Sequence, residues 1–306
     1  MSDTTIYLLT GATAGLGLQA TAALLQNPKA RIVTGVRAPE RRARFAGLPQ
    51  DRVTRYPLDL ASLRSVEQFC AAVRDGLGDQ HIEAIGLNAG VQITTGLEMS
   101  EDGYEKTFAV NHLAHWLIRE RLIDRVRAGG RVVVTCSGTH DPDDRVARSF
   151  GFRGGVFPCA DIVATGALDL EANPAQACLD RYATSKMANV LQASHWAQTD
   201  PDRPTVLFDP GLMPGTDLAR DRSAIEQFAW NTILPALGFL MRGVSSAQRS
   251  GRMLAALMAG ERKARSGDYV EYSGRLLQPW SQTNDPAMRA DLDDTSRRLV
   301  SAAMAA

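Results

Sequence analysis

Short apolar runs alternate with longer amphipathic segments along most of the chain. The runs predict buried strands, which we place at residues 6–10, 31–36, 53–58, 82–87, 131–135 and 205–208. The segments between them predict helices, which we place at residues 16–25, 62–74, 101–126 and 182–198. Strands that are apolar on both faces are typical of a parallel sheet covered by helices. We therefore expect an α/β protein with a single-domain Rossmann fold over residues 1–306, a doubly wound parallel sheet of about seven strands with helices on both faces.

The composition argues against several classes of function. The chain carries 34 basic and 34 acidic residues, so no excess of charge indicates a nucleic acid or an anionic membrane as partner. Its four cysteines have neither the C-x-x-C spacing nor a histidine at zinc-site spacing, so we expect reduced thiols and no metal site. The N-terminus lacks a basic stretch followed by an apolar run, which predicts no secretory signal and a cytoplasmic location. The apolar segment 228–241 is too short for a transmembrane span and is expected to be a buried or pocket-lining helix pair.

A glycine-rich turn follows the first predicted strand directly. It reads Thr10-Gly11-Ala12-Thr13-Ala14-Gly15-Leu16-Gly17 and leads into the first predicted helix. Glycines at such a junction let the backbone approach a pyrophosphate, while the helix N-terminus supplies free N–H groups and the positive end of its dipole. The alternative is an ordinary glycine-rich turn, but the strand–turn–helix position favours a dinucleotide site.

The end of the second predicted strand bears on the choice of nicotinamide cofactor. An NAD-binding fold usually has an acidic residue there, but this chain has Arg37, followed by Arg41, Arg42 and Arg44. A guanidinium can bind the 2′-phosphate of NADP with two hydrogen bonds, whereas a carboxylate would repel it. We therefore expect NADP(H), the alternative being that Arg37 only faces solvent.

Candidate acid–base chemistry lies in the helical segment that contains Tyr182 and Lys186. Residues four apart share one face of a helix, so the phenol and the ammonium are expected to point the same way. A nearby ammonium favours the phenolate and is expected to lower the pKa of Tyr182 toward the working range. A Y-x-x-x-K pattern can also be a partly exposed helix face, but the glycine turn in the same chain favours catalysis.

Together, the T-G-x-x-x-G-x-G turn and the Y-x-x-x-K pair resemble the short-chain dehydrogenase/reductase family over nearly the whole chain. The resemblance implies a catalytic tetrad in which Ser137 polarises the substrate carbonyl and Asn111 holds a water that links the lysine to a proton relay. Tyr182 and Lys186 complete that tetrad. The resemblance also implies a set of cofactor-binding residues: Thr10, Gly11, Thr13, Gly15, Leu16, Gly17, Arg37, Asp59, Leu60, Asn88, Ala89, Gly90, Tyr182, Lys186, Pro210, Gly211 and Thr216.

Three details resemble the branch that contains retinol dehydrogenases and light-dependent protochlorophyllide reductases. They are the basic residue after the second strand, the Y-A-T-S-K-M-A-N sequence at 182–189, and the closing helical segment from Asp285. The chain departs from the compact family core in an insert at 138–180, which contains Phe150, Phe152, Val156 and Phe157. We expect this insert and residues 212–243 to form lid regions on the substrate side, which favours a sizeable apolar substrate.

The sequence thus predicts an NADP(H)-dependent oxidoreductase that moves a hydride between the nicotinamide and a small-molecule carbonyl or alcohol, with Tyr182 as general acid/base. A reductase of C=C bonds and a non-catalytic NADP sensor are the alternatives. Substrate identity, direction and stereochemistry stay open, as does the choice between monomer and homodimer. We expect His112, His115 and His140 to be helix-surface or loop residues rather than catalysts, because the Tyr–Lys pair already supplies the proton chemistry.

Overall fold

The computed structural model describes residues 4–38, 47–170, 173–213 and 243–305. It contains one sheet with strand order β3-β2-β1-β4-β5-β6-β7-β8. The strands span Thr5–Leu9 (β1), Ala30–Val36 (β2), Val53–Pro57 (β3), Ile82–Leu87 (β4), Val126–Thr135 (β5), Thr205–Asp209 (β6), Tyr269–Glu271 (β7) and Leu276–Leu277 (β8). All neighbours pair in parallel except β7 and β8, so the fold is the single α/β Rossmann-like domain that the sequence predicts.

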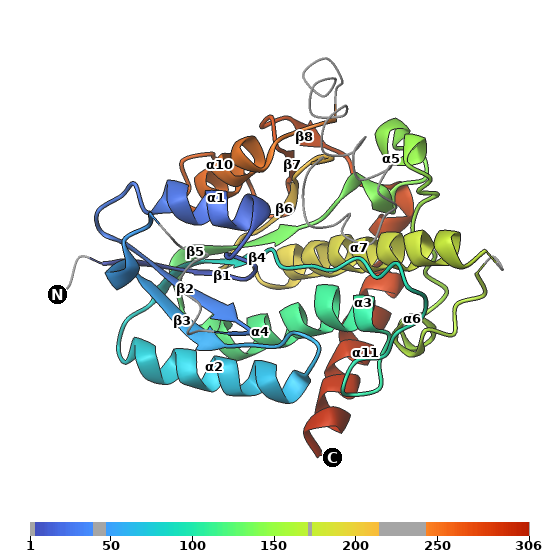
Figure 1. Cartoon of the computed structure of the whole chain (residues 1–306), viewed down its shortest axis with the longest axis horizontal. Helices are drawn as coiled ribbons and strands as arrows, with labels where there is room; N and C mark the ends of the chain where they lie inside the picture. Colours follow the sequence, from blue (N-terminus) through green and yellow to red (C-terminus); the bar gives the residue numbers. More distant parts are fainter. Residues whose placement is uncertain (1–3, 39–46, 171–172, 214–242, 306) are drawn as a thin grey trace.

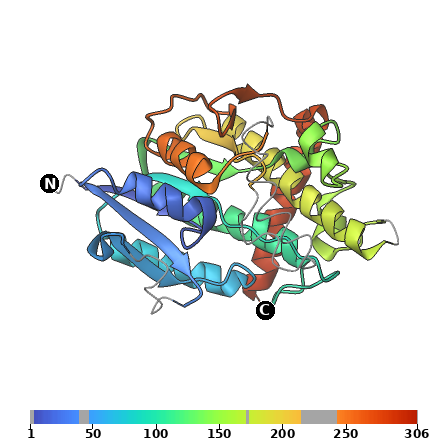
Figure 2. The same ribbon diagram turned by 45° about the horizontal axis from the view of Figure 1, so that its top comes forward.

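Helices cover both faces of this sheet (Figures 1 and 2). On one face, α1 (Gly15–Leu24) packs against α10 (Ala247–Met258). The other face is covered by α2 (Leu63–Leu77), α4 (Ala114–Leu122), α7 (Pro174–Thr199) and α11 (Pro286–Ala305). Each layer has its own core, because apolar side chains of every central strand alternate between the two faces.

The strand order places the functional edge of the sheet. The chain runs from β1 outward to β3, then returns to β4 beside β1 and continues outward in the other direction. A ligand crevice is expected where the order reverses, at the carboxyl ends of β1 and β4. The glycine-rich turn follows β1 at that point, so the fold brings it to the crevice.

The long helix α7 differs from the sequence prediction at its start. Its N-cap is Asn173, whose side chain accepts a hydrogen bond from the Ala175 N–H, and Pro174 occupies the first turn. Tyr182 therefore lies two turns inside the helix and not at its beginning. A helix of 26 residues holds this side chain more firmly than a fraying terminus would.

The helix predicted over 101–126 is interrupted. The chain forms α3 (Lys106–Phe108), a π-helical segment over Ala109–Leu113, α4, and a short 3-10 turn over Ile123–Arg125. A π-helical turn shifts the register of the side chains that follow it and is frequent at functional sites. Asn111 lies in the middle of this segment.

Two strand predictions also need correction. The fifth strand begins at Val126, because the Gly-rich residues before Arg131 continue the ladder with β4 through an irregular register. The sequence places neither β7 nor β8, since their three and two residues are too few to show an alternating pattern. The two strands pair antiparallel around a turn at Gly274, whose φ of 88° suits glycine.

Short helical pieces break up the region between Ser137 and α7. They are a 3-10 turn over Gly138–His140, α5 (Arg145–Ser149) and α6 (Ala160–Thr165). Most of the expected lid at 212–243, including the apolar segment 228–241, lies outside the described residues.

Candidate active site

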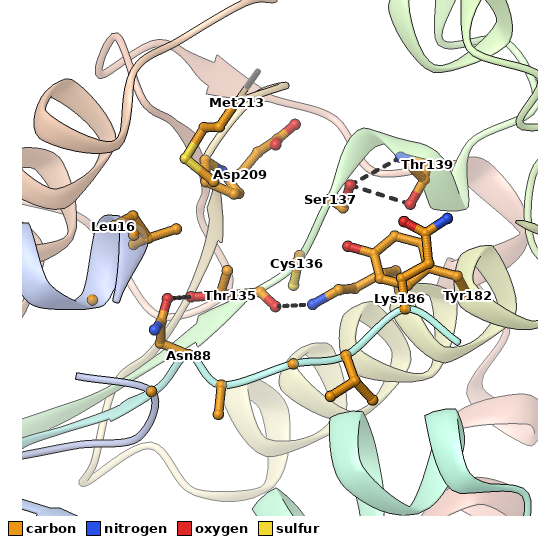
Figure 3. Close-up of a pocket in the computed structure, with 18 of the residues that line it drawn as sticks. Leu16, Asn88, Thr135, Cys136, Ser137, Thr139, Tyr182, Lys186, Asp209 and Met213 are labelled. Carbon is orange, nitrogen blue, oxygen red and sulfur yellow. Dashed lines mark hydrogen bonds between the residues drawn. The ribbon is translucent and has the colours of Figure 1, made fainter. Parts of the chain in front are cut away.

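A cleft of about 1220 Å³ runs across the carboxyl ends of the strands. The sequence-predicted residues that line it are Gly11, Thr13, Gly15, Leu16, Gly17, Arg37, Asp59, Leu60, Asn88, Ala89, Gly90, Ser137, Tyr182, Lys186, Pro210 and Gly211. Residues far apart in the sequence thus share one cavity, part of which is shown in Figure 3. Two of the expected residues, Thr10 and Asn111, are fully buried behind its wall, and Thr216 lies outside the described residues.

The glycine-rich turn is close-packed at two of its glycines. A Cβ on Gly17 would lie 2.1 Å from the carbonyl oxygen of Gly11, and one on Gly11 would lie 2.9 Å from the Cα of Ala89. Larger residues would push the turn away from β4 at both positions. By contrast, Gly15 has a φ of 51° and open space around its notional Cβ, so its backbone faces the cleft.

Thr10 fixes the turn from behind. Its Oγ1 accepts hydrogen bonds from the backbone N–H groups of Asn88 and Ala89, at 2.9 Å and 3.0 Å. The Asn88 amide returns a hydrogen bond to the Thr10 carbonyl at 3.1 Å and accepts one from the Thr135 hydroxyl at 3.2 Å. The turn after β1 is therefore joined to the ends of β4 and β5, which explains the position of Asn88 without requiring ligand contact.

The N-terminus of α1 suits a pyrophosphate. Its N-cap is Ala14, which has no side chain able to cap the first turn, and that turn contains no acidic residue. The backbone N–H groups there are left for a ligand, and Ala14 through Gly17 line the cleft. Uncapped N–H groups beside a close-packed glycine turn fit the diphosphate of a dinucleotide.

The adenosine end of the cleft is formed by the segments that follow β2 and β3. Arg37 is exposed there, lines the cleft, and has no hydrogen-bond or ion-pair partner among the described residues. Asp59 lines the same end and uses one carboxyl oxygen to accept from the Ala61 N–H at 2.9 Å. Of the basic run after β2, Arg41, Arg42 and Arg44 lie outside the described residues.

Tyr182 and Lys186 lie on one face of α7 and are both buried. The Lys186 Nζ lies 5.8 Å from the centre of the Tyr182 ring and donates a hydrogen bond to the Thr135 carbonyl at 3.2 Å. Figure 3 shows the two side chains leaving the helix toward the end of β5. The arrangement keeps a cationic group beside the phenol, as the spacing predicts.

The pKa of the Tyr182 phenol differs from the expectation. Burial raises the pKa of Tyr182, and the nearby Asp209 carboxylate raises it further. Burial also lowers the pKa of Lys186 to about 8, which weakens the influence of its positive charge. The expectation that Lys186 lowers the pKa of Tyr182 is therefore wrong for this arrangement, because the rise that burial causes is larger than any lowering by the nearby ammonium.

Ser137 follows β5 and stands at the other side of the phenol. Its Oγ accepts hydrogen bonds from the Thr139 N–H at 3.3 Å and from the Thr139 hydroxyl at 3.1 Å. Because both bonds use the lone pairs of Ser137, its own O–H stays available as a donor toward the cleft. Thr139 was not predicted from the sequence, and a hydroxyl two residues after the candidate serine was the signal that could have found it.

Asn111 joins two walls of the site. Its Oδ1 accepts from the Val91 N–H at 2.7 Å, and its Nδ2 donates to the Val91 carbonyl at 3.0 Å and to the Ser185 hydroxyl at 2.9 Å. The side chain thus ties the segment after β4 to α7, directly before Lys186. The water-binding role that the resemblance implies for Asn111 stays a prediction.

Two of the three histidines correct a sequence prediction. His112 and His115 lie in the helical segment but are buried instead of on its surface, whereas His140 lies in the short turn after Ser137, where a loop is expected, and is buried there. Burial lowers the pKa of His112 and His115 to about 3, so both are neutral at physiological pH. His115 bonds the Thr10 hydroxyl at 3.0 Å and the Asn111 carbonyl at 3.1 Å, which connects the glycine-rich turn to the π-helical segment.

The aromatic residues of the insert divide between the site and the core. Phe150 and Phe152 line the cleft, and the Phe152 ring centre lies 5.9 Å from that of Tyr182. Phe157 packs into the main core instead, and Val156 is exposed. Two of the four side chains are thus placed to contact a substrate, while the proposed lid function of the insert stays a prediction.

Three acidic residues of the cleft were not predicted from the sequence: Asp144, Asp209 and Glu271. Asp209 is the most buried of them, with 7% of its surface exposed. Its signal was present in the sequence, because a charged residue ends an apolar strand at the edge where ligands bind. The structure also adds apolar lining from Ile93, Val110, Leu212 and Met213.

Comparison with known proteins identifies the family. A family model described as short chain dehydrogenase matches residues 5–143. The Streptomyces sp. (strain C5) protein named "Putative daunorubicin C-13 ketoreductase DnrU" is 30% identical over 306 residues, covering 96% of this chain and 91% of that protein. Protochlorophyllide reductase B from Hordeum vulgare is 27% identical over 301 residues, covering 92% of this chain and 73% of that protein.

Solved structures agree on the fold. NADPH-bound carbonyl reductase from chicken fatty liver superimposes with a TM-score of 0.60 at 15% identity, covering 90% of this chain and 98% of that one. Within the described part of the chain, no helix combines the length and the apolar character that crossing a membrane would need. The chain belongs to the short-chain dehydrogenase/reductase family, an oxidoreductase family that uses a nicotinamide cofactor, and lies in its protochlorophyllide reductase-like branch.

Proposed function

We propose that the chain is an NADP(H)-dependent oxidoreductase that reduces the carbonyl group of a sizeable apolar substrate, with Tyr182 as the proton donor. One observation carries this proposal. A single cleft holds an uncapped helix N-terminus with its glycine turn, and also Ser137, Tyr182 and Lys186. Binding residues and proton chemistry are thereby within reach of one dinucleotide and one small substrate.

The choice of NADP(H) rests on Arg37. Its guanidinium is exposed at the adenosine end of the cleft and has no partner among the described residues, so it is free to bind a 2′-phosphate. Asp59, at the same end, accepts a hydrogen bond from the Ala61 N–H with one carboxyl oxygen, which stabilises the segment after β3.

The residues of this chain would act on the substrate as follows. The Ser137 hydroxyl and the Tyr182 phenol would both donate hydrogen bonds to the carbonyl oxygen, which stabilises the negative charge that develops on it. Bound NADPH supplies the hydride to the carbonyl carbon. The Tyr182 proton would then pass to the oxygen, and Lys186 would offset the charge left on the phenol.

The buried position of Tyr182 favours reduction over oxidation. Because its pKa is raised by burial, the phenol stays protonated at neutral pH. A protonated phenol is ready to donate a proton to a carbonyl, whereas oxidation of an alcohol would require the phenolate.

Apolar lining supports a large, mostly hydrophobic substrate. Side chains of Ile93, Val110, Phe152 and Met213 line the same cleft as Tyr182 and Ser137, and the Phe152 ring lies beside that of Tyr182. Such a wall with a few polar groups is typical of pockets that bind organic molecules. The relative named as a ketoreductase supports a carbonyl as the reacting group.

The relatives named protochlorophyllide reductase favour a second candidate, the reduction of a C=C bond. It would use the same cofactor and the same Tyr–Lys pair, so the products must discriminate between the two. The third candidate is a binding protein that senses NADP without turnover.

The cytoplasmic location stays a prediction, since the relatives include chloroplastic proteins. The choice between monomer and homodimer also stays a prediction.

The test is NADPH consumption with a panel of carbonyl compounds from small aldehydes to bulky polycyclic ketones, with NADH in parallel. We expect alcohol products from the bulky members and a preference for NADPH. Saturated ketones from enone substrates would establish C=C reduction instead. Binding of NADPH without turnover of any member would indicate the sensor.

A further inference from the structure

We propose that Asp209 binds a positively charged group of the substrate, so that the preferred substrates are ketones that carry an amine near the carbonyl. This inference rests on the proposed carbonyl reduction and names its substrate class. It concerns the end of the cleft at β6, where Pro210 and Gly211 are predicted to bind the cofactor but Asp209 itself has no predicted role.

Asp209 is the last residue of β6, and the ladder with β5 places it beside the start of the Ser137 loop. Thr135 pairs with Phe208, and the Cys136 N–H donates to the Phe208 carbonyl at 2.8 Å. In the view of Figure 3, Ser137 lies between Asp209 and Tyr182. A Cβ on Gly138, the residue after Ser137, would lie 3.5 Å from Asp209 Oδ2, so a group bound by Asp209 would be close to the Ser137 loop.

The carboxyl of Asp209 is only partly satisfied. It is 93% removed from solvent, since 7% of the residue surface is exposed, and it lines the cleft. Oδ1 accepts a hydrogen bond from the Gly211 N–H at 2.9 Å. Oδ2 has no hydrogen-bond or ion-pair partner in the part of the chain that the structure describes.

The neighbouring charges increase the need for a cation. A Cβ on Gly138 would lie 2.8 Å from Asp144 Oδ2 and 3.5 Å from Asp209 Oδ2, so the two carboxyl groups converge on this glycine. Glu271, on the adjoining strand β7, is buried as well and lines the same cleft. Three carboxyl groups thus border one end of the cavity.

Arg145, Lys186 and Arg275 also line the cleft, and two of the three have other partners. Arg275 binds Glu271 at 3.0 Å, and Lys186 donates to the Thr135 carbonyl. Arg145 is exposed at the rim of the cleft and makes no ion pair among the described residues. Among the described residues, none of these cations forms an ion pair with the Asp209 carboxylate, although the charge of Lys186 acts on it from a longer distance.

Burying a carboxylate without a counter-ion is unfavourable, and the pKa of Asp209 reflects this. Burial raises the pKa of Asp209 to about 6, and the charges of Asp144 and Glu271 contribute to the rise while Lys186 opposes it. The group is nevertheless ionised for the most part at neutral pH. A cationic group of a ligand would supply the missing charge in a site already shielded from water.

The experiment compares two ketones of nearly equal shape. Phenacyltrimethylammonium carries a permanent cation next to a ketone, and neopentyl phenyl ketone is its neutral carbon isostere. Calorimetry measures binding of each to the NADP⁺-loaded protein, in which no reduction can occur, and NADPH oxidation measures turnover. The proteins are the wild type, Asp209→Asn, which keeps the acceptor for Gly211, and Asp143→Asn, a control that removes an exposed carboxylate outside the cleft.

We expect the wild type and Asp143→Asn to bind the cation at least about tenfold more tightly than the isostere. Asp209→Asn should lose this preference while its affinity for the neutral ketone and for NADPH is unchanged. Equal affinities for both ketones in the wild type would overturn the proposal even if both are reduced. A uniform loss of NADPH affinity in Asp209→Asn would overturn it too, because Asp209 would then contact the cofactor. Preferential cation binding without reduction of either ketone would support the site and reject carbonyl reduction.

Discussion

Lys186 Nζ lies 5.8 Å from the centre of the Tyr182 ring and is bonded at 3.2 Å to the Thr135 carbonyl at the end of β5. The lysine is thus held between Tyr182, the proposed proton donor, and the strand that leads to Ser137. Both side chains are buried, which raises the pKa of the phenol and lowers that of the ammonium. This pair gives the first two predictions.

Tyr182→Phe should lower the rate of carbonyl reduction by at least about a hundredfold, because the ring keeps its packing but loses the proton donor. NADPH binding should change little, since the phenol is one of many groups in the cleft. Steady-state kinetics and a fluorescence titration with NADPH measure the two effects. A rate near that of the wild type would remove Tyr182 from the mechanism.

Reduction should slow as the pH rises above about 8, the pKa that burial gives Lys186. Below that pH the amine is protonated and can offset charge on the phenol, and above it the charge is lost. The value of kcat/KM should therefore fall with increasing pH in the alkaline range. Lys186→Met should give a low rate without this dependence, and a flat wild-type profile up to about pH 10 would contradict the role of the lysine.

Arg37→Gln should reduce the preference for NADPH over NADH by about tenfold to a hundredfold, mainly through a higher KM for NADPH. The exposed Arg31 on β2 does not line the cleft, so Arg31→Gln is the matched control and should leave the ratio unchanged. The cofactor ratio of the two variants settles whether Arg37 binds a phosphate or only faces solvent.

Much of this site follows from local sequence patterns. The glycine turn and the Tyr–Lys pair each depend on spacing within one element, and spacing is visible in the chain. The position of Tyr182 two turns into α7 was missed, because the residues before it show no strong amphipathic pattern and the cap at Asn173 stands far upstream. The interruption at Asn111 was missed for a related reason, since an apolar π-helical turn has the same composition as an α-helix.

What the sequence could not supply are the effects of burial. The prediction that Lys186 lowers the pKa of Tyr182 considered a pair of charges but not their loss of hydration, which depends on α7 being covered on all sides. The prediction that His112 and His115 lie on a helix surface failed for the same reason, because the sequence does not show that other parts of the chain cover a polar residue of a helix. Phe157 looked like a cleft residue by its proximity to Phe152, yet it packs in the core.

Asn111→Ala should destabilise the protein by about 1–3 kcal/mol, because the partly buried Val91 N–H and carbonyl lose their side-chain partner and the Ser185 hydroxyl keeps only its bond to the Tyr182 carbonyl. The rate should fall as well, since Ser185 precedes Lys186 in α7. Urea unfolding measures the first effect, and Gln282→Ala, which removes an exposed side chain, should cost about 0.5 kcal/mol or less. A stable but inactive Asn111→Ala protein would favour the water-binding role over the structural one.

Asp209→Asn should stabilise the protein without ligand at neutral pH. The carboxyl has a folded-state pKa of about 6 against an ordinary value of 3.8, so folding opposes its ionisation. The stability of the wild type should therefore decline as the pH rises from about 4 to about 6 and should then stay at the lower level. An amide does not titrate in this range. The free energy of unfolding of the variant should therefore exceed that of the wild type by on the order of 1–3 kcal/mol above about pH 7, and the two should be equal below about pH 4. Thermal unfolding of both proteins across this range measures the difference. If the difference does not depend on pH, Asp209 is already balanced by a cation in the free protein, and no charged substrate is needed to satisfy it.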